Sequence, residues 1–318
     1  MSAYGVVIVT YNSEAEIGRC LDSLAACSKR AEVVVVDNGS TDGTLEEIRN
    51  RPDVTLVANL WNRGFAAACN QGVALLHHDC ILLFNPDACR PKGLDALVAA
   101  CSADGVAAAA GRLTGTDGRL QQGFMVRRLP TAWTLAFEAL GVNRLWPANP
   151  VNRRYRCFGF DAERAQPVEQ PPGAFLMVSR QAWQALGGFD ESFFPLWFED
   201  VDFCRRAGDA GYRILYVPAA SAVHAGGHSV RKLSSASRQA YWYGTLLSYA
   251  GKHFRPGAVR AVSVAVTLGV LLRGFLDAVN SRSFASTIAA IRVVGLAGRY
   301  FKAGRSEMAS LSRAFADF

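Results

Sequence analysis

The chain has 318 residues, of which 50% are apolar and 10% aromatic, so it can bury a sizeable core in one large domain or two. This composition is that of a globular protein and excludes a disordered one. The formal net charge of +7 conceals an asymmetry: residues 229–318 hold 13 Lys and Arg against 3 Asp and Glu, a net +10 that leaves −3 for residues 1–228. The basic character belongs to the tail.

The cysteines and the chain start give expectations about the compartment. Eight cysteines are dispersed without a C-x-x-C pair, as expected for reduced core residues of a cytosolic protein. Residues 1–4 lead into a strand-like run with no basic n-region or cleavage site, which predicts no secretory signal. The longest uncharged apolar run of the tail, 261–272, has 12 residues. Because roughly 20 are needed to span a bilayer, no transmembrane helix is predicted.

Strand and helix patterns alternate through the first hundred residues. Aliphatic runs with polar ends predict strands at 5–10, 32–37, 54–58 and 80–84. A Ser13-x-x-Glu16 capping box opens one helix, and helical spacing predicts two more near 40–50 and 65–76. Parallel strands need crossover connections, so this alternation predicts an α/β fold with a mostly parallel central sheet flanked by helices.

Polar residues gather where the predicted strands end. These ends are Thr10-Tyr11-Asn12, Asp37-Asn38, Asn62-Arg63 and Asn85-Pro86-Asp87. In sheets of this kind the ligand site lies beyond the carboxyl ends of the strands. The sequence therefore predicts that four strand ends point at one crevice.

The second half of the chain is less regular. Residues 112–172 are rich in proline and tryptophan, which predicts long loops and short helices. From Gly173 the signals sharpen into an aliphatic run at 175–178, an acidic helix start at Glu199 and a strand at 213–217. Beyond Ser229 the pattern is helical and basic.

The turn Asn85-Pro86-Asp87 follows the apolar run 80–84. Proline fixes its own backbone and biases Asn85 towards an extended conformation, so the strand ends abruptly and Asp87 is aimed out of the sheet. A carboxylate in that place can hold a divalent cation. Alone, such a tripeptide is more often plain turn chemistry, and only the other strand ends favour a metal site.

Two further strand ends carry charged groups. Asp37 ends a run of four valines and can accept hydrogen bonds from a base N–H or from ribose hydroxyls, but capping of the helix at 40–50 explains it equally well. Arg63 precedes a helix and can help to bind a diphosphate there, although an isolated arginine is more often solvated. The lack of G-x-G-x-x-G after the first strand argues against a dinucleotide-binding fold.

Three acids, Glu199, Asp200 and Asp202, follow the aromatic pair Trp197-Phe198. Aromatic neighbours partly desolvate a carboxylate and raise its proton affinity towards the range of a general base. Alternatives remain open, since the first two acids can complement a helix dipole. Asp202 can pair with the arginines three and four residues further on.

His224 lies in a glycine-flanked segment after a strand. A lone histidine is usually not a metal ligand. Neutral imidazole is nevertheless a common ligand, and the neighbouring glycines would let the loop close over a diphosphate. His228 and Ser229 are secondary candidates.

Together these stretches resemble the family 2 inverting glycosyltransferases with a GT-A fold, and in particular the bacterial rhamnosyltransferase-like branch. The matching stretches run in family order through 6–13, 35–43, 62–66, 70–72, 85–88, 187–191, 199–202 and His224. The resemblance implies a GT-A catalytic domain at 1–228, with a nucleotide-sugar half at 1–111 and an acceptor half at 112–228. A basic helical extension at 229–318 follows.

The resemblance also implies roles for single residues. The nucleotide-sugar residues would be Thr10, Tyr11, Asn12, Asp37, Asn62, Arg63, Gly64 and Asn85. Asp87 and His224 would be the ligands of Mg²⁺ or Mn²⁺. An amide stands at Asn85 where many relatives carry the first acid of Asp-x-Asp, so the metal would depend more on Asp87, His224 and the diphosphate. Asp200 would be the base, with Glu199 as its acidic neighbour.

The implied function is metal-dependent, inverting sugar transfer in cell-surface polysaccharide synthesis. The first interpretation is the transfer of rhamnose from dTDP-rhamnose to a saccharide or lipid-linked acceptor. UDP-galactose, UDP-N-acetylglucosamine or a furanose donor are alternatives, as is a catalytically silent nucleotide-sugar-binding or scaffold subunit. Nucleic-acid binding is not expected, because no recognisable module is present.

The tail gives a separate prediction. Two stripes lie at helical spacing, one apolar with Phe284, Ile288, Ile291 and Gly295, the other basic with Arg292, Arg299 and Lys302. This pattern is typical of a helix on an anionic membrane, and the charge of the tail favours that interpretation. Packing on the catalytic domain or in a homodimer remains an alternative. We expect a cytoplasmic protein, peripheral at the inner face of the cytoplasmic membrane.

Overall fold

The computed structural model describes residues 4–27, 31–227, 232–281, 284–304, 307–308 and 311, with the side chains at 275–281 and 284–287 outside the description. The chain forms two compact units. The first is built from Met1–Leu129, Arg156–Glu191 and Glu199–Ser229, and the second from Pro130–Tyr155, Ser192–Phe198 and Val230–Phe318. Two segments of the predicted domain 1–228 thus belong to the unit of the C-terminal helices, and the functional division at 228 stays a prediction.

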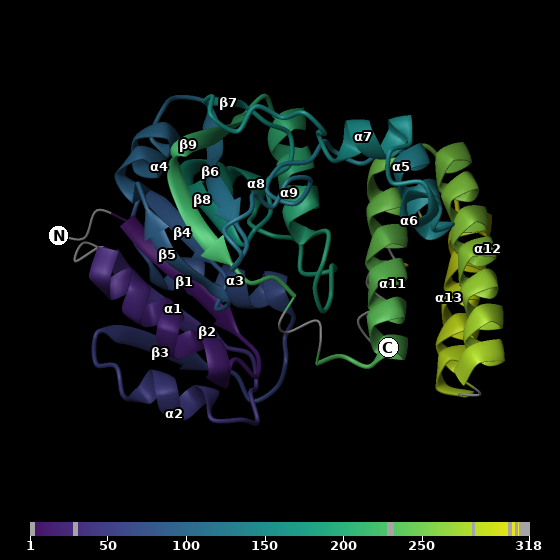
Figure 1. Cartoon of the computed structure of the whole chain (residues 1–318), viewed down its shortest axis with the longest axis horizontal. Coiled ribbons are helices and arrows are strands. Elements are labelled where there is room, and N and C mark those ends of the chain that lie inside the picture. Colours follow the sequence, from purple (N-terminus) through teal and green to yellow (C-terminus); the bar gives the residue numbers. More distant parts are fainter. Residues whose placement is uncertain are drawn as a thin grey trace. The chain divides into compact units, whose positions relative to one another are not determined.

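The first unit is built on one sheet (Figure 1). Its strands are β1 (Tyr4–Thr10), β2 (Ala31–Asp37), β3 (Val54–Ala58), β4 (Cys80–Phe84), β5 (Ala88–Lys92), β6 (Val106–Thr114), β7 (Gln166–Pro167), β8 (Phe175–Ser179) and β9 (Arg213–His224). Their order is β3-β2-β1-β4-β8-β6-β9-β5, with β7 beside β9. The four strands predicted in the first hundred residues are confirmed.

The sheet is mixed rather than mostly parallel. Strands β1 to β4 pair in parallel, as predicted, and so do β6 and β9. Strand β8 runs antiparallel to both β4 and β6, and β5 and β7 run antiparallel to β9. The difference arises because β8 enters the sheet after the irregular segment 115–174 and fills the place between two strands that precede it in the chain.

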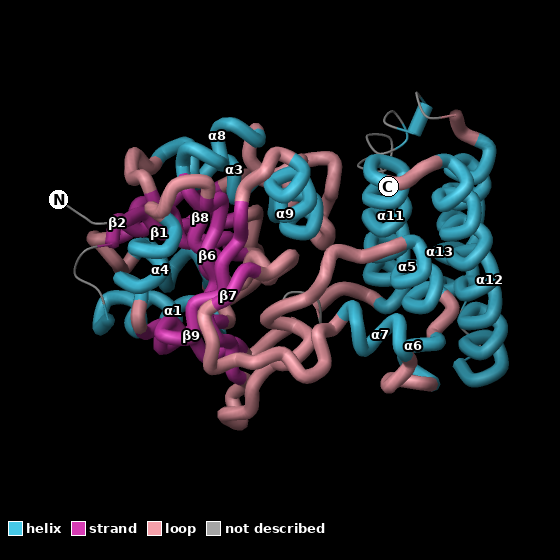
Figure 2. The backbone as a smooth tube through the Cα atoms, turned by 90° about the horizontal axis from the view of Figure 1, so that it is seen from above, coloured by secondary structure: helices cyan, strands magenta, loops and turns pink. Residues whose placement is uncertain are grey.

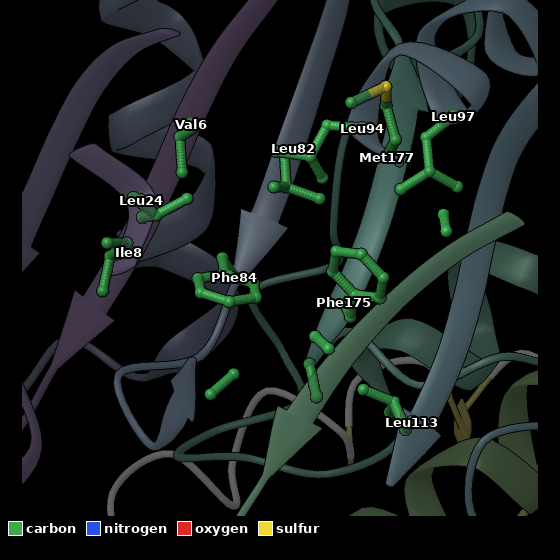
Figure 3. Packing of buried hydrophobic residues seen from close by; sticks show 14 of the residues in the cluster. Val6, Ile8, Leu24, Leu82, Phe84, Leu94, Leu97, Leu113, Phe175 and Met177 are labelled. Carbon is green, nitrogen blue, oxygen red and sulfur yellow. The ribbon is translucent and has the colours of Figure 1, made fainter. Parts of the chain in front are cut away.

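Helices cover both faces of the sheet (Figure 2). They are α1 (Glu14–Cys27), α2 (Thr44–Arg49), α3 (Phe65–Leu75), α4 (Leu94–Cys101), α8 (Arg180–Leu186) and α9 (Glu199–Asp209). Side chains alternate along β1, so that Val6 and Ile8 belong to the hydrophobic cluster on the face covered by α1 and α4 (Figure 3). Val7 and Val9 belong to the cluster on the other face, to which α3, α8 and α9 contribute. Burial on both faces explains why the central strands are continuous aliphatic runs.

The second unit is helical. Its elements are α5 (Ala132–Ala139), α6 (Val142–Leu145), α7 (Pro150–Tyr155), α11 (Ser235–His253), α12 (Pro256–Ser281) and α13 (Phe284–Lys302). Close approach of α12 to α5 requires a glycine, because a Cβ at Gly269 would lie 2.0 Å from the carbonyl oxygen of Ala139. The helical nature predicted for the tail is confirmed.

One described helical window, Pro256–Gly274, is long and apolar enough to cross a membrane by length and composition. Its mean hydropathy is 1.5 and 39% of it is buried within the protein. The sequence prediction of no such helix counted only the run 261–272, whereas the helix continues past the arginines at both ends. Core helices of soluble proteins also satisfy this criterion.

Candidate active site

The ends of β1 and β2 are joined through Asp37. This carboxylate is fully buried, and its Oδ1 accepts hydrogen bonds from the hydroxyls of Thr10, at 2.8 Å, and Ser40. Its Oδ2 accepts the main-chain N–H of Ser40 at 2.9 Å. Helix α2 begins later, with Gly43 at its N-cap, so the capping role considered for Asp37 is wrong. The carboxylate instead closes the turn that follows β2.

A second link ties these loops together. The Oδ1 atom of Asn12 accepts the main-chain N–H of Thr41 at 2.8 Å, while the N–H of Asn12 donates to Ser40 Oγ at 2.8 Å. Asn12 has a left-handed φ of 52°, which asparagine tolerates better than most residues. The neighbouring Tyr11 is partly exposed beside this link.

Asn38 joins the end of β2 to the loop before α3. Its Nδ2 donates to Asn62 Oδ1 at 2.9 Å and to the carbonyl oxygen of Gly64 at 3.1 Å. Its Oδ1 accepts the N–H of Arg63 at 3.0 Å. The side chain of Arg63 is exposed, as an isolated arginine is expected to be, while Gly64 is buried with a φ of 86°. Three of the four predicted strand ends are therefore joined by hydrogen bonds.

The fourth strand end carries Asp87 and meets His224. Asn85 makes a tight turn, since its carbonyl oxygen accepts the N–H of Ala88 at 3.0 Å. Strands β5 and β9 then pair with Ala88 opposite His224, and the N–H of Ala225 donates to the carbonyl oxygen of Asp87 at 3.0 Å. This register brings His224 Nε2 to 3.4 Å from Asp87 Oδ1, with both side chains buried. From the sequence, only the family resemblance indicated that these two residues act together.

The carboxylates of α9 are held at the same edge of the sheet. Asp200 Oδ2 accepts the N–H of Gly173 at 3.0 Å, and its Oδ1 accepts the N–H of Val201 at 2.7 Å. The next residue, Ala174, accepts the N–H of Asn85 through its carbonyl oxygen at 3.1 Å. Two adjacent residues thus connect Asp200 to the turn that carries Asp87.

The two acids at the start of α9 differ in electrostatics. Burial raises the pKa of Glu199 well above its ordinary value, and the neighbouring Asp200 charge adds to this. Burial also raises the pKa of Asp200, whereas the Gly173 N–H and the Arg127 charge act in the opposite direction. Glu199 Oε2 is buried without a hydrogen-bond partner among the residues that the structure describes. Of the two acids, Asp200 is the one whose side-chain oxygens accept main-chain hydrogen bonds, and these contacts favour its ionised form.

Asp202 has a structural role, as its alternative interpretation predicts. It is fully buried and its Oδ2 accepts a hydrogen bond from Arg206 Nε at 2.7 Å. Arg206 also donates to the carbonyl oxygens of Leu186 and Gly188. Asn70 of α3 holds the same turn from the other side, bonding the N–H and the carbonyl oxygen of Phe189 at 3.0 and 2.9 Å. The stretch 187–191 is therefore bonded to α3 and to α9, the helix that carries Asp200.

Three residues of the irregular segment surround the site and were missed in the sequence. Gln121 contacts His224, Phe124 stacks on its ring with centroids 5.2 Å apart, and Arg127 lies over the Phe124 ring at 5.4 Å. They follow one another at intervals of three in a tight turn, where the N–H of Phe124 donates to the carbonyl oxygen of Gln121. That spacing was the only available signal, and it is common in turns.

The described part of the chain contains no group of three or more His, Cys, Asp or Glu that could hold a metal by itself. The secondary candidates His228 and Ser229 lie outside the described residues.

The two stripes predicted for the tail helix are exposed where the structure describes them. Ile288, Ile291 and Gly295 of the apolar stripe are exposed, as are Arg292, Arg299 and Lys302 of the basic stripe, while the side chain of Phe284 is not described.

Comparison with known proteins shows which family this chain resembles. Residues 5–165 match the model of glycosyl transferase family 2, and residues 152–301 match glycosyl transferase family group 2. An N-acetylglucosaminyl-diphospho-decaprenol L-rhamnosyltransferase of Mycobacterium tuberculosis is 33% identical over 267 residues, which are 78% of this chain and 84% of that protein.

Solved structures show the same fold. A mannosyltransferase from Pyrobaculum calidifontis in complex with GDP-Man and Mn²⁺ superposes with a TM-score of 0.52 and 19% identity, covering 99% of this chain and 85% of that chain. GalNAc-T7 with UDP, GalNAc and Mn²⁺ gives a TM-score of 0.53 at 17% identity, over 70% of this chain and 44% of that chain. The predicted GT-A fold with a helical C-terminal region is confirmed, and the chain belongs to glycosyl transferase family 2.

Proposed function

We propose that this glycosyltransferase performs a metal-dependent, inverting transfer of rhamnose from dTDP-rhamnose to a saccharide or lipid-linked acceptor in cell-surface polysaccharide synthesis. The transferred sugar and the lipid-linked acceptor follow the Mycobacterium tuberculosis relative, whose name specifies rhamnosyl transfer to N-acetylglucosaminyl-diphospho-decaprenol. The dTDP nucleotide of the donor follows the family resemblance. The observation that carries the chemistry is the hydrogen-bonded connection from Asp200 through Gly173 and Ala174 to the Asn85 turn.

In this proposal Asp200 is the base. Its two oxygens accept main-chain N–H groups, which favour the ionised form of the carboxylate and fix its orientation. It removes the proton of the acceptor hydroxyl while that oxygen attacks the anomeric carbon. Direct displacement inverts the anomeric configuration and needs no covalent enzyme intermediate. Burial raises the pKa of Glu199 and so favours its neutral form, which would add no second negative charge beside the base.

The nucleotide-sugar residues remain those predicted. They are Thr10, Tyr11, Asn12, Asp37, Asn62, Arg63, Gly64 and Asn85. The contacts that tie the ends of β1 and β2 to the loop before α3 support this assignment, because they fix one rigid rim on which a nucleotide would rest. The exposed Arg63 guanidinium is available to the negative charge of a diphosphate.

The chemistry of Asp87 and His224 fits Mg²⁺ or Mn²⁺. A buried carboxylate and an imidazole face each other, as two of the ligands of such a cation would, and within the described part of the chain the imidazole Nε2 has no hydrogen-bond partner. Two protein ligands leave positions for diphosphate oxygens and water. When bound, the cation would neutralise charge that develops on the departing nucleoside diphosphate.

The proposed location is the cytoplasmic face of an anionic membrane. Large apolar side chains are exposed on the second unit, namely Val264, Leu268, Leu271 and Leu272 of α12 and Ile288 and Ile291 of α13. The net charge of +10 in residues 229–318 complements anionic lipid headgroups. A homodimer through the same side chains is the alternative, and its test is the oligomeric state in dilute solution.

Nucleotide titration tests the proposal most directly. Binding of dTDP, UDP and GDP is measured by calorimetry with Mg²⁺, with Mn²⁺ and with EDTA, using Asp87→Asn as the control for the cation. We expect preferential binding of dTDP that depends on the cation. Preference for UDP would redirect the donor to a UDP-sugar, and binding without any transfer to lipid-linked or saccharide acceptors would favour a silent binding subunit.

A further inference from the structure

Gln121 contacts His224 at two points that together fix its orientation. Gln121 Nε2 donates to the main-chain carbonyl oxygen of His224 at 2.7 Å, and Gln121 Oε1 lies 3.0 Å from His224 Nδ1. A carbonyl oxygen can only accept, so the NH₂ group of the amide must face it. The amide oxygen then faces the ring and also can only accept. The hydrogen of this contact therefore belongs to Nδ1 of the imidazole.

The placement of that hydrogen decides what the other ring nitrogen offers. A neutral imidazole that carries its hydrogen on Nδ1 presents a lone pair at Nε2. His224 is 3% exposed, and its Nε2 has no hydrogen-bond partner among the described residues and lies 3.4 Å from Asp87 Oδ1. Two facing acceptors repel each other unless a proton or a cation lies between them. The pair is therefore arranged as a receptor for positive charge.

The ring plane is fixed by the same segment. Phe124 stacks on the imidazole with an angle of 9° between the planes, and its main-chain N–H donates to the carbonyl oxygen of Gln121 at 3.0 Å. One tight turn thus supplies both the contact with Nδ1 and the stacking surface. Neither Gln121 nor Phe124 lies on the strands that carry Asp87 and His224.

We propose that Gln121 is a positioning residue for the cation site, because it holds His224 in the tautomer that directs the Nε2 lone pair towards Asp87. This inference rests on the proposed function and deepens its metal site. Ligating histidines generally donate their second N–H to an oxygen acceptor, and loss of that acceptor typically weakens metal affinity about 10- to 100-fold. The nucleotide-sugar residues are not involved.

The first test measures Mn²⁺ alone, by electron paramagnetic resonance titration of the full chain. Gln121→Leu removes both contacts at similar volume and should raise the Kd for Mn²⁺ about 10- to 100-fold. Gln121→Glu keeps an acceptor at Nδ1 and should retain an affinity near that of the unmodified protein. Gln166→Leu is the matched control, since Gln166 also donates to a main-chain carbonyl oxygen but at Asp161. It should bind Mn²⁺ normally.

The second test reads the tautomer without any metal or activity. The chain has five histidines, and ¹⁵N-histidine NMR with His224→Gln as the assignment control isolates the signals of His224. We expect the Nδ1–H form in the unmodified protein and in Gln121→Glu, and a shift towards Nε2–H in Gln121→Leu. Addition of Mg²⁺ should change the Nε2 resonance and leave Nδ1 protonated.

Three results would overturn the inference. One is an Nε2–H tautomer, or a doubly protonated ring indifferent to Mg²⁺, in the unmodified protein. Another is equal Mn²⁺ affinity in the unmodified protein and a correctly folded Gln121→Leu variant, which leaves the proposed function standing. The third is the absence of Mn²⁺ binding by the unmodified protein, which would remove the proposed metal site together with the role of Gln121.

Discussion

At the scale of single residues, three acids that lie close together in the sequence differ in the groups that they contact. Asp202 is neutralised by Arg206, Glu199 is buried beside a second carboxylate, and Asp200 accepts two main-chain N–H groups. The sequence predicted Asp200 as base and Glu199 as its neighbour only through a resemblance. The two main-chain hydrogen bonds that Asp200 accepts give a physical reason for that proposal.

Removal of the proposed base should affect the chemical step and spare binding. Asp200→Asn retains the shape of the side chain but cannot take a proton. We expect kcat to fall about 10²- to 10⁴-fold, the usual contribution of a general base, with little change in the Kd for the nucleotide sugar. Steady-state kinetics and calorimetry check this, with Asp209→Asn as an exposed control on the same helix. Near-normal turnover would contradict the role of Asp200.

The Arg127 charge should set the acid limb of the pH–rate profile. Burial raises the pKa of Asp200 and Arg127 lowers it. Catalysis needs the ionised carboxylate, so the rate is lost as the pH falls through this pKa. Arg127→Gln should therefore move the acid limb of kcat/KM to higher pH. A limb that stays in place, or moves to lower pH, would show that Arg127 does not act on the base.

At the scale of elements, the sequence predicts those strands and helices whose residues follow a regular apolar pattern. Strands β1 and β4 were predictable because burial on both faces requires continuous aliphatic runs. The antiparallel insertion of β8 was not, because pairing partners distant in sequence leave no local signal. Gln121, Phe124 and Arg127 were missed for a related reason: only the stacking and hydrogen bonds of the folded chain distinguish them from other turn residues.

The contact between Asp202 and Arg206 should be a major support of the turn at 187–191. Asp202→Ala leaves a largely buried guanidinium without its carboxylate and should lower the free energy of unfolding by about 3 kcal/mol or more. Asp209→Ala breaks the exposed pair with Arg205 on the same helix and should cost less than about 1 kcal/mol. Urea denaturation measures both. Equal losses would mean that burial of the first pair has no energetic weight.

The close approach of α12 to α5 should make Gly269 intolerant of any side chain. In Gly269→Ala the new Cβ would lie 2.0 Å from the Ala139 carbonyl oxygen, so a helix must shift. We expect a loss of about 1–3 kcal/mol in unfolding free energy, as for overpacked cores. In Gly298→Ala on α13 the new Cβ would meet no atom of the described residues within 4 Å, so this change should instead stabilise the protein by up to about 1 kcal/mol. Thermal and urea unfolding distinguish the two; a stabilised Gly269→Ala would contradict the packing described.

At the scale of the whole molecule, charge and exposed apolar surface are concentrated in the same part of the chain. The net charge of +10 and the exposed leucines of α12 both belong to the second unit, apart from residue 229. The sequence predicted an amphipathic tail from α13 alone. The structure adds the apolar side chains of α12, because their exposure depends on which side of the helix packs against its neighbours.

Membrane association should therefore depend on α12 and on ionic strength. The full chain should sediment with vesicles that contain phosphatidylglycerol at low salt, and less so as salt is raised. Leu268→Asp combined with Leu272→Asp should reduce binding at least about tenfold, since each buried leucine contributes about 1.5–3 kcal/mol. Leu60→Asp, at a 90% exposed leucine of the first unit, is the control. Failure of the unmodified chain to sediment at low salt would refute membrane docking.

The packing of Trp197 and Phe198, which precede Glu199 and Asp200, limits how the chain can be divided in protein engineering. Trp197 and Phe198 both have left-handed φ values, 75° and 70°, and their rings pack against Trp242, with Phe198 also against Tyr249. These four aromatics belong to the second unit, whereas Glu199 begins the next segment of the first. A chimera that exchanged only residues 229–318 with a relative would separate the aromatics from each other. Grafting should instead transfer Pro130–Tyr155 and Ser192–Phe198 together with the tail, with crossover points on either side of each.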